Sequence, residues 1–363
     1  MNTSDPDNDE LRAIRDRIDE IDARIQDLVT ARARCALEVA AIKRARGDDS
    51  FYRPEREAQV LQTVLSRNTG PLSNEVLVRL FREIMSACLA LQRPMTIAYL
   101  GPEGTFTESA VYKHFGHAVV TRPLAAIDEI FREVEAGSAD FGVVPIENSS
   151  EGAVDHTLDM FMGSPLKICS EVELRIHHNL MGRVGGLDGV RRVFAHQMAL
   201  AQCREWLDAH LAGIPREAVS SNAEAARRAQ NDTEAAAIAG LHAAEVYGLG
   251  ILADNIEDEP DNTTRFLVIG RAIPEPSGRD KTSLLVSTAN RPGALYRLLA
   301  PLAEHGISMT RIESRPSRRG MWDYVFFIDI AGHCRDAKVS QALAALEQEA
   351  AMLKVLGSYP EGR

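Results

Sequence analysis

The run FGVVPIENSSEGAV, residues 141–154, changes character in its middle and predicts both a strand and a binding site. Its first half is apolar and β-branched, as in a buried strand, and Glu147, Asn148, Ser149 and Ser150 follow. Open α/β sheets bind their ligands at the carboxyl ends of strands. Because residues 95–275 alternate short β-rich runs with helical patterns, we expect an α/β domain with a ligand site beside these polar residues.

Two other turns of this segment carry unusual residues. In TIAYLGPEGTFTESA (96–110), Gly101 and Gly104 provide backbone freedom for a tight turn or open a carboxylate-binding helix start. This turn lacks the GxGxxG pattern and the ribose-binding acid of a nicotinamide site, so no such cofactor is expected. In EDEPDNTTRFLVIG (257–270), Thr264 and Arg265 stand before a strand. Such a pair is by itself more often structural than catalytic.

The segment before residue 94 contains helical patterns only. One apolar stripe predicts a helix over residues 10–46, formed by Ile14, Ile18, Ile21, Ile25, Leu28, Val39 and Ile42. Extending the stripe reaches Arg32 and comes close to Lys43. Two cations on a core-facing stripe are costly unless an anion neutralises them.

Two further helical patterns, over about 54–66 and 74–93, place Glu57 and Gln92 on apolar faces. Each residue alone would be a rim residue whose stem covers apolar surface. Together with the two cations they predict a polar pocket for a carboxylated ligand within a helical bundle. Arg15 precedes Arg32 by seventeen residues, about 25 Å of helix. A partner helix would have to supply Arg15, which implies a two-fold dimer with shared sites.

The last segment has the pattern β-α-β-β-α-β, typical of a ferredoxin-like fold. The expected strands are 281–288, 308–314, 323–330 and 352–360, and the expected helices begin near Pro292 and at 336. Boundaries at Arg93-Pro94 and in PEPSGRDK (274–281) divide the chain into three domains, 1–94, 95–275 and 279–363.

Composition narrows the class of protein. A chain of 363 residues that is 45% hydrophobic and 26% charged is globular and too long for one core. No run of about 18 apolar residues occurs, so no membrane partner is expected. A net charge of −11 argues against nucleic acid. Five scattered cysteines favour the cytoplasm. His177, His178 and His196 lack metal-ligand spacing, so neither a metal nor a cofactor is expected.

The helical segment resembles the all-helical chorismate mutase domain in the spacing of Arg15, Arg32, Lys43, Arg56-Glu57 and Gln92. The resemblance implies an intertwined dimer that rearranges chorismate to prephenate. By position, Arg32 and the partner's Arg15 would hold the carboxylates, Lys43 and Gln92 the ether oxygen, and Glu57 the ring hydroxyl. Arg53, Arg56 and Cys88 would complete the chorismate site. At the positions of Arg53 and Cys88, a familiar sequence pattern of the chorismate mutase domain has a carboxylate and a serine.

The middle segment resembles prephenate dehydratase, whose motifs appear in order as GPEGTF, VVPIENSSEGAV, SSNAEAA (220–226) and NTTRF. The resemblance implies two lobes of the periplasmic-binding-protein kind with prephenate between them. Thr264 would assist departure of the ring hydroxyl as carbon dioxide leaves, and Arg265 would be the charge partner. The remaining cleft residues would be Asn148, Ser149, Gln202 and Ser221. Ala195 departs from the serine that the family often has before His196.

The motifs RPGAL (291–295) and ESRP (313–316) resemble the ACT regulatory domain. That resemblance implies feedback inhibition by phenylalanine, bound by Gly293, Ala294, Leu295, Glu313, Ser314, Arg315 and Pro316. The whole chain thus resembles the bifunctional chorismate mutase/prephenate dehydratases, with phenylpyruvate as product and a homodimer or higher homo-oligomer as the assembly. Two alternatives stay open: a monofunctional dehydratase with an inactive mutase remnant, and a non-catalytic amino-acid sensor.

Overall fold

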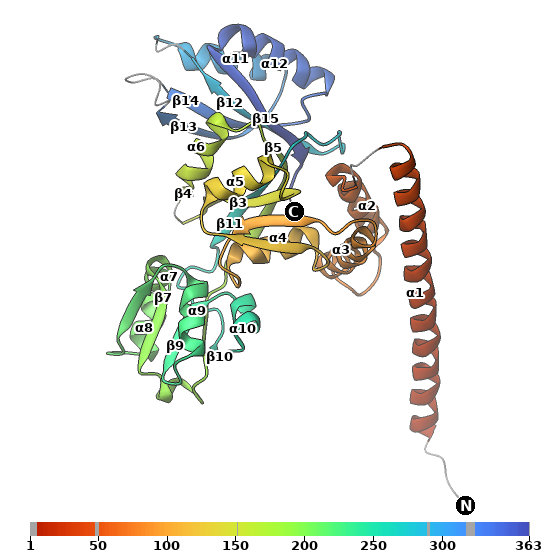
Figure 1. Cartoon of the computed structure of the whole chain (residues 1–363), viewed down its shortest axis with the longest axis vertical. Helices are drawn as coiled ribbons and strands as arrows, with labels where there is room; N and C mark the ends of the chain where they lie inside the picture. Colours follow the sequence, from red (N-terminus) through yellow and green to blue (C-terminus); the bar gives the residue numbers. More distant parts are fainter. Residues whose placement is uncertain (1–5, 48–50, 151, 289–290, 317–323, 363) are drawn as a thin grey trace, which may run out of the picture. The chain divides into compact units, whose positions relative to one another are not determined.

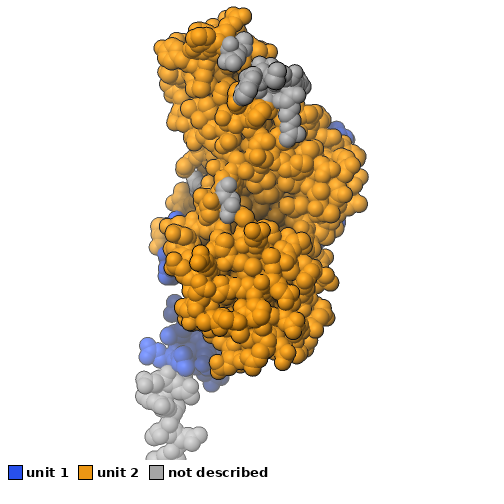
Figure 2. All heavy atoms as spheres, turned by 90° about the vertical axis from the view of Figure 1, so that its left-hand side faces the viewer, with its two compact units in different colours: residues 1–52, 70–94, 115–119 blue, residues 53–69, 95–114, 120–363 orange. Residues whose placement is uncertain are grey.

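The computed structural model describes residues 6–47, 51–150, 152–288, 291–316 and 324–362 (Figure 1). The chain forms two compact units, coloured separately in Figure 2. The first comprises residues 1–52, 70–94 and 115–119, and the second comprises residues 53–69, 95–114 and 120–363. No helix within the described ranges is both long and apolar enough to cross a membrane.

The first unit contains the helices α1 (Pro6–Ala45) and α3 (Asn74–Ala90), which contact each other. The predicted helix over 10–46 is therefore one uninterrupted helix of 40 residues. Ser73 caps α3, because its side chain accepts a hydrogen bond from the Val76 amide. Residues 115–119 join this unit through the Ala118 amide, which donates to Ser86 Oγ over 3.3 Å.

The apolar stripe of helix α1 is exposed to solvent in the part of the chain that the structure describes. Exposed fractions of these side chains range from 44% at Leu37 to 68% at Leu28. The other members of the exposed stripe are Leu11, Ile14, Ile18, Ile21, Ile25, Val39 and Ile42. Ala40 is the one fully buried residue among the described side chains of this helix. Apolar surface of this extent in one element is a mark of an interaction face.

The second unit begins with helix α2 (Pro54–Arg67) and continues into a lobe built on one sheet. The strand order is β2-β1-β3-β11-β5, with β4 paired to β3. Strands β1, β2 and β3 run parallel, whereas β11 runs antiparallel to both β3 and β5. The strands are β1 (Thr96–Leu100), β2 (Val120–Leu124), β3 (Phe141–Asn148), β4 (Gly152–Ala153), β5 (Lys167–Arg175) and β11 (Thr263–Gly270). The helices are α4 (Phe106–Phe115), α5 (Ile127–Glu135) and α6 (Asp155–Gly163).

The second lobe has a sheet of its own, in the order β10-β6-β9-β7-β8. Its central strand, AAAIA, is completely buried, and alanines on α9 pack against it. Small side chains on both elements allow the helix to approach the sheet closely. The strands are β6 (Asn179–Gly182), β7 (Arg192–His196), β8 (Arg216–Val219), β9 (Ala235–Ala239) and β10 (Gly250–Ala253). The helices are η1 (Leu187–Gly189), α7 (Gln197–Gln202), α8 (Arg204–His210), α9 (Asn222–Gln230) and α10 (Leu241–Tyr247).

The last part of the second unit confirms the predicted β-α-β-β-α-β order. Its sheet has the order β13-β14-β12-β15, and its strands are β12 (Asp280–Ser287), β13 (Met309–Pro316), β14 (Tyr324–Ala331) and β15 (Met352–Pro360). Helices α11 (Ala294–Glu304) and α12 (Ala337–Glu349) contribute Leu298 and Leu346 to one core with Leu284 and Ile328 of the sheet. Strand β15 also contacts β5, so this sheet adjoins the first lobe.

Candidate active site

Strands β3 and β11 bring Asn148 and Thr264 together as a cross-strand pair. Asn148 Nδ2 donates a hydrogen bond to Thr264 Oγ1 over 2.8 Å, and to Asn262 Oδ1 over 2.8 Å. The amide of Ser150 in turn donates to Asn148 Oδ1 over 3.0 Å. Asn148 is thereby fixed in one orientation, with its nitrogen toward Thr264.

The orientation of Asn148 decides what the Thr264 hydroxyl does. Its oxygen accepts from Asn148, and a hydroxyl that accepts one hydrogen bond still has its own hydrogen to donate. The Thr264 hydroxyl can therefore donate its hydrogen to a further acceptor. This is the role that a side chain needs if it is to stabilise charge on a departing oxygen.

The hydrogen-bond chain continues into the second lobe. Asn262 Nδ2 donates to Gln202 Oε1 over 3.2 Å, and His178 Nε2 lies 2.8 Å from the same oxygen. Burial lowers the pKa of His178, although hydrogen bonding to Gln202 opposes this shift. A neutral imidazole that donates through Nε2 has a bare Nδ1, and this atom has no hydrogen-bond partner among the described residues. Residues from both lobes thus share one network.

Asn262 is a site residue that the sequence reasoning missed. Its side chain is buried, with 3% of the residue exposed, and it connects Asn148 to Gln202. The only signal was its place in the run DNTTRF, two positions before Thr264. A buried amide needs partners for its donors and its acceptor, and the network supplies them.

The other predicted prephenate residues make contacts of their own, outside the chain of hydrogen bonds from Thr264 to His178. Ser149 follows β3 and joins it to the start of β11, because its hydroxyl accepts a hydrogen bond from the Thr263 amide over 3.0 Å. Ser221 caps α9 by accepting from the Glu224 amide. Arg265 forms ion pairs with Glu171 and Asp329. Its role as a charge partner of substrate stays a prediction.

The glycine-rich turn of the first lobe is a tight turn. Gly104 has φ +82°, and a Cβ there would lie 3.2 Å from the Ala243 backbone of α10. The Gly104 amide donates to Glu108 Oε2 over 2.6 Å, and His242 Nε2 lies 3.0 Å from the same oxygen. The hydrogen bond to Glu108 raises the pKa of His242 against the opposing effect of burial. This pair connects α4 of the first lobe to α10 of the second.

The predicted chorismate residues are divided between the two compact units. Lys43 Nζ and Arg93 Cζ lie 5.9 and 5.8 Å from the Phe51 ring centroid, so two cations lie over one aromatic ring. Gln92 follows α3, and its buried Oε1 has no hydrogen-bond partner among the described residues. Cys88 is buried on α3, Arg15 is exposed and Arg32 is half-buried on α1. Arg53, Arg56 and Glu57 lie at the start of α2. Their assembly into one pocket stays a prediction.

The predicted phenylalanine residues occupy the start of α11 and the end of β13. Gly293 has φ +75° and precedes Ala294 and Leu295, the first residues of α11. The residues on β13 are Glu313, Ser314, Arg315 and Pro316. Strand β13 is an edge strand of its sheet. Arg315 pairs with Asp155 and Asp159 of α6, which connects this strand to the first lobe.

Three family models match the chain in succession. They are chorismate mutase type II at residues 14–93, prephenate dehydratase at 97–274 and the ACT domain at 282–348. A bifunctional chorismate mutase/prephenate dehydratase of Stutzerimonas stutzeri is 56% identical over 358 residues, covering 97% of this chain and 98% of the relative. A prephenate dehydratase of Mycobacterium marinum is 40% identical over 280 residues, covering 74% of this chain and 89% of that protein.

A solved structure is also similar. The prephenate dehydratase of Arthrobacter aurescens in complex with L-Phe has a TM-score of 0.67 and 40% sequence identity. The match covers 73% of this chain and 89% of that one.

Proposed function

Because the chain belongs to the family of bifunctional chorismate mutase/prephenate dehydratases, we propose that each chain holds a complete dehydratase site and that two chains share each mutase site. The enzyme rearranges chorismate to prephenate and converts prephenate to phenylpyruvate, two reactions of phenylalanine biosynthesis. Residues 1–94, 95–275 and 279–363 are the proposed domains for mutase, dehydratase and regulation.

In the dehydratase, Thr264 donates a hydrogen bond to the ring hydroxyl of prephenate as that group departs. Loss of carbon dioxide supplies the electrons, and formation of the aromatic ring drives the reaction, so one placed donor and a clamp for the carboxylates suffice. The observation that carries this role is the hydrogen bond from Asn148 Nδ2 to Thr264 Oγ1. Asn148, Ser149, Gln202 and Ser221 complete the proposed site, while the guanidinium of Arg265, next to Thr264 in the strand, is paired with Glu171 and Asp329.

In the mutase, two copies of α1 pair along their apolar stripes. The support is the stripe itself, whose side chains are 44% or more exposed over nine positions. Arg15 lies about 25 Å along the helix from Arg32, so an antiparallel partner would deliver it to the opposite site. A pericyclic rearrangement needs a compact conformer and donors aimed at the ether oxygen, which Lys43 and Gln92 would supply.

Phenylalanine inhibits the enzyme at the ACT domain. The L-Phe complex of the Arthrobacter aurescens relative supports this effector, and Gly293, with φ +75°, stands directly before a helix start, a place where carboxylates commonly bind. Edge strand β13 exposes Met309 and Ile312, which suits a paired domain. The proposal includes a homodimer or higher homo-oligomer and a cytoplasmic location, as the cysteine usage predicts.

The experiment that tests the dehydratase role compares Thr264→Ala with Thr264→Ser. Thr264→Ala removes the hydroxyl, so fed chorismate should accumulate as prephenate while phenylpyruvate formation falls by orders of magnitude. Thr264→Ser keeps a hydroxyl at the same position and should retain most of the activity. Rapid phenylpyruvate formation by a folded Thr264→Ala enzyme would move the donor role to another residue.

A further inference from the structure

The cross-strand pair next to Asn148 and Thr264 is Glu147 with Arg265. Successive residues of a strand point to opposite faces of the sheet. Asn148 and Thr264 therefore face the second lobe's residues, while Glu147 and Arg265 face the other way. Their charged partners include residues of the ACT domain.

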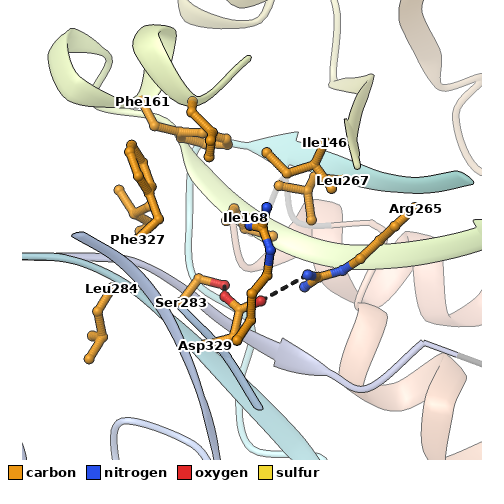
Figure 3. A pocket seen from close by; sticks show the side chains of 12 residues that line it. Ile146, Phe161, Ile168, Arg265, Leu267, Ser283, Leu284, Phe327 and Asp329 are labelled. Atoms are coloured by element: carbon orange, nitrogen blue, oxygen red, sulfur yellow. Dashed lines mark hydrogen bonds and ion pairs between the residues drawn. The ribbon is translucent and has the colours of Figure 1, made fainter. Parts of the chain in front are cut away.

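Arg265 is held by carboxylates of both domains. Its guanidinium lies 2.6 Å from Glu171 Oε2 of β5 and 2.8 Å from Asp329 Oδ2 of β14. Figure 3 shows Arg265 and Asp329 pointing toward each other, with Ser283 beside the carboxylate. The Ser283 hydroxyl donates to Asp329 Oδ1. The side chains of Arg265, Glu171 and Asp329 are 12%, 2% and 8% exposed, so water screens this cluster weakly.

Glu147, whose side chain is 40% exposed, has an ion-pair partner on the neighbouring ACT strand. Arg311 of β13 places Nε 3.0 Å from Glu147 Oε2, and the Arg311 side chain is 13% exposed. Each member of the pair next to Thr264 and Asn148 thus has an oppositely charged partner in the ACT sheet. The register of β3 and β11 shifts directly after Arg265, and such a bulge changes the direction in which side chains point.

We propose that Asp329 and Arg311 of the ACT domain are positioning residues for the dehydratase reaction. They fix Arg265 and Glu147, and through these strand neighbours they hold Thr264 and Asn148 at the distance and angle that catalysis requires. Removing the Asp329 carboxylate leaves Arg265 with Glu171 alone, and removing the Arg311 charge takes from Glu147 its cation in the ACT sheet. Loss of a partner in a weakly hydrated ion pair is destabilising, and here the loss falls on the residues next to Thr264 and Asn148. The inference rests on the proposed role of Thr264 as the hydroxyl donor.

The test is Asp329→Asn in the full-length enzyme, assayed with prephenate in the absence of phenylalanine. We expect kcat to fall about 10- to 100-fold, because a displacement of about 1 Å at a reacting group can cost roughly 100-fold. KM should change less than about twofold, since substrate contacts remain. The matched control is Asp159→Asn, which removes one of the two carboxylates that pair with Arg315 between the same two domains, in an ion pair that does not involve the strand neighbours of Thr264. Its kcat should stay near the wild-type value.

A rescue experiment separates positioning from general stability. Arg311→Glu and Glu147→Arg should each lower kcat, and the double variant should recover part of it, because the pair is restored with reversed polarity while residue 147 still lies opposite Arg265. Circular dichroism and thermal unfolding of the same samples report whether each variant chain is folded. If Asp329→Asn fails to fold, Arg311→Gln provides the same kcat and KM comparison.

Three results would overturn the inference: an unchanged kcat in Asp329→Asn, an equal loss in Asp159→Asn, or a change confined to KM. A wild-type kcat in Asp329→Asn beside an inactive Thr264→Ala would reject the positioning role alone. Activity in Thr264→Ala would instead reject the donor role on which it rests.

Discussion

Helix α1 and strand β11 carry predicted site residues in opposite states of burial. In α1, Ile25 and Leu28 are 52% and 68% exposed, whereas Leu267 and Val268 of β11 are 3% and 0% exposed. Thr264, on the buried strand, has its hydrogen-bond partner in the same chain. Arg15 and Arg32, on the exposed helix, lie too far apart to serve one site from one copy. An element that is buried by its own chain can therefore complete a site within that chain, whereas an element with an exposed apolar face indicates a partner.

The largest expected effect comes from reversing the hydrogen bond that polarises Thr264. Asn148→Asp replaces the donating amide with an acceptor at nearly constant shape, so the Thr264 hydroxyl would turn and donate to residue 148. Dehydratase kcat should fall by roughly 10³, at the upper end of the loss for one oriented donor. Mutase activity should be unchanged, which steady-state assays on chorismate and on prephenate will show.

Asn222→Asp is the matched control for this substitution. Asn222 Oδ1 accepts from the His196 amide over 2.8 Å, and a carboxylate oxygen can accept in the same way. The control should keep its dehydratase activity. Equal losses in the two variants would show that added charge, and not the direction of one hydrogen bond, is responsible.

A somewhat smaller effect is expected on the helical side of the comparison. Lys43→Ala should remove roughly 2.7–4 kcal/mol of transition-state stabilisation from the mutase, which is about 10²–10³ in kcat. Turnover of supplied prephenate should persist, because the dehydratase network contains no residue of α1. Arg44→Ala, a neighbouring exposed cation, serves as control. Normal mutase turnover in Lys43→Ala would show that Lys43 is not part of the mutase site.

The smallest effect concerns the contact between the dehydratase lobes. The pKa of His242 is raised above 6.5 by its hydrogen bond to Glu108, with burial opposing, and Glu245 lies 3.5 Å away on the same helix. The stability from a raised pKa is complete below the unfolded pKa and is lost as pH rises through the folded pKa. Burial raises the pKa of Glu108, but its hydrogen bonds, of which the one with His242 has the largest effect, outweigh burial and lower the pKa below 4.5. Its contribution is therefore lost as pH falls through that lowered value.

Wild-type enzyme and His242→Gln should consequently differ most in Tm between about pH 4.5 and 6.5. We expect a difference of a few degrees, since about 1 kcal/mol shifts Tm by roughly 2–4 °C in domains of this size. Calorimetric scans across pH 4–9 measure it. If the difference in Tm between the wild-type enzyme and His242→Gln grew toward pH 9, the stability would not come from the ion pair of His242 with Glu108.

The order of the elements was predictable because apolar periodicity follows secondary structure. The strand pairing of Asn148 with Thr264 was not, since register depends on where β3 and β11 meet and on the bulge after Arg265. The long α1 followed from its stripe, and its termini differ from the prediction by a few residues, as helix ends usually do.

The charged residues between the first lobe and the ACT sheet had a weak signal in the sequence. Glu171 and Asp329 stand inside apolar strands, KICSEVELR and YVFFIDIA. A buried carboxylate requires a partner, but periodicity does not say which cation supplies it. Only tertiary packing brings Arg265 to both carboxylates, so periodicity could not predict these two ion pairs.

The central claim, that dehydratase sites belong to one chain and mutase sites to two, is tested most directly by mixed dimers. Arg15→Ala and Arg32→Ala chains with different affinity tags are co-expressed, and the doubly tagged dimer is purified. One of its two mutase sites keeps both arginines, so we predict about half of the wild-type mutase activity from two inactive parents. A mixed dimer of Arg32→Ala with Lys43→Ala has no intact site and should stay inactive, while every dimer keeps full dehydratase activity. A purified Arg15→Ala/Arg32→Ala dimer as inactive as its parents would contradict the account.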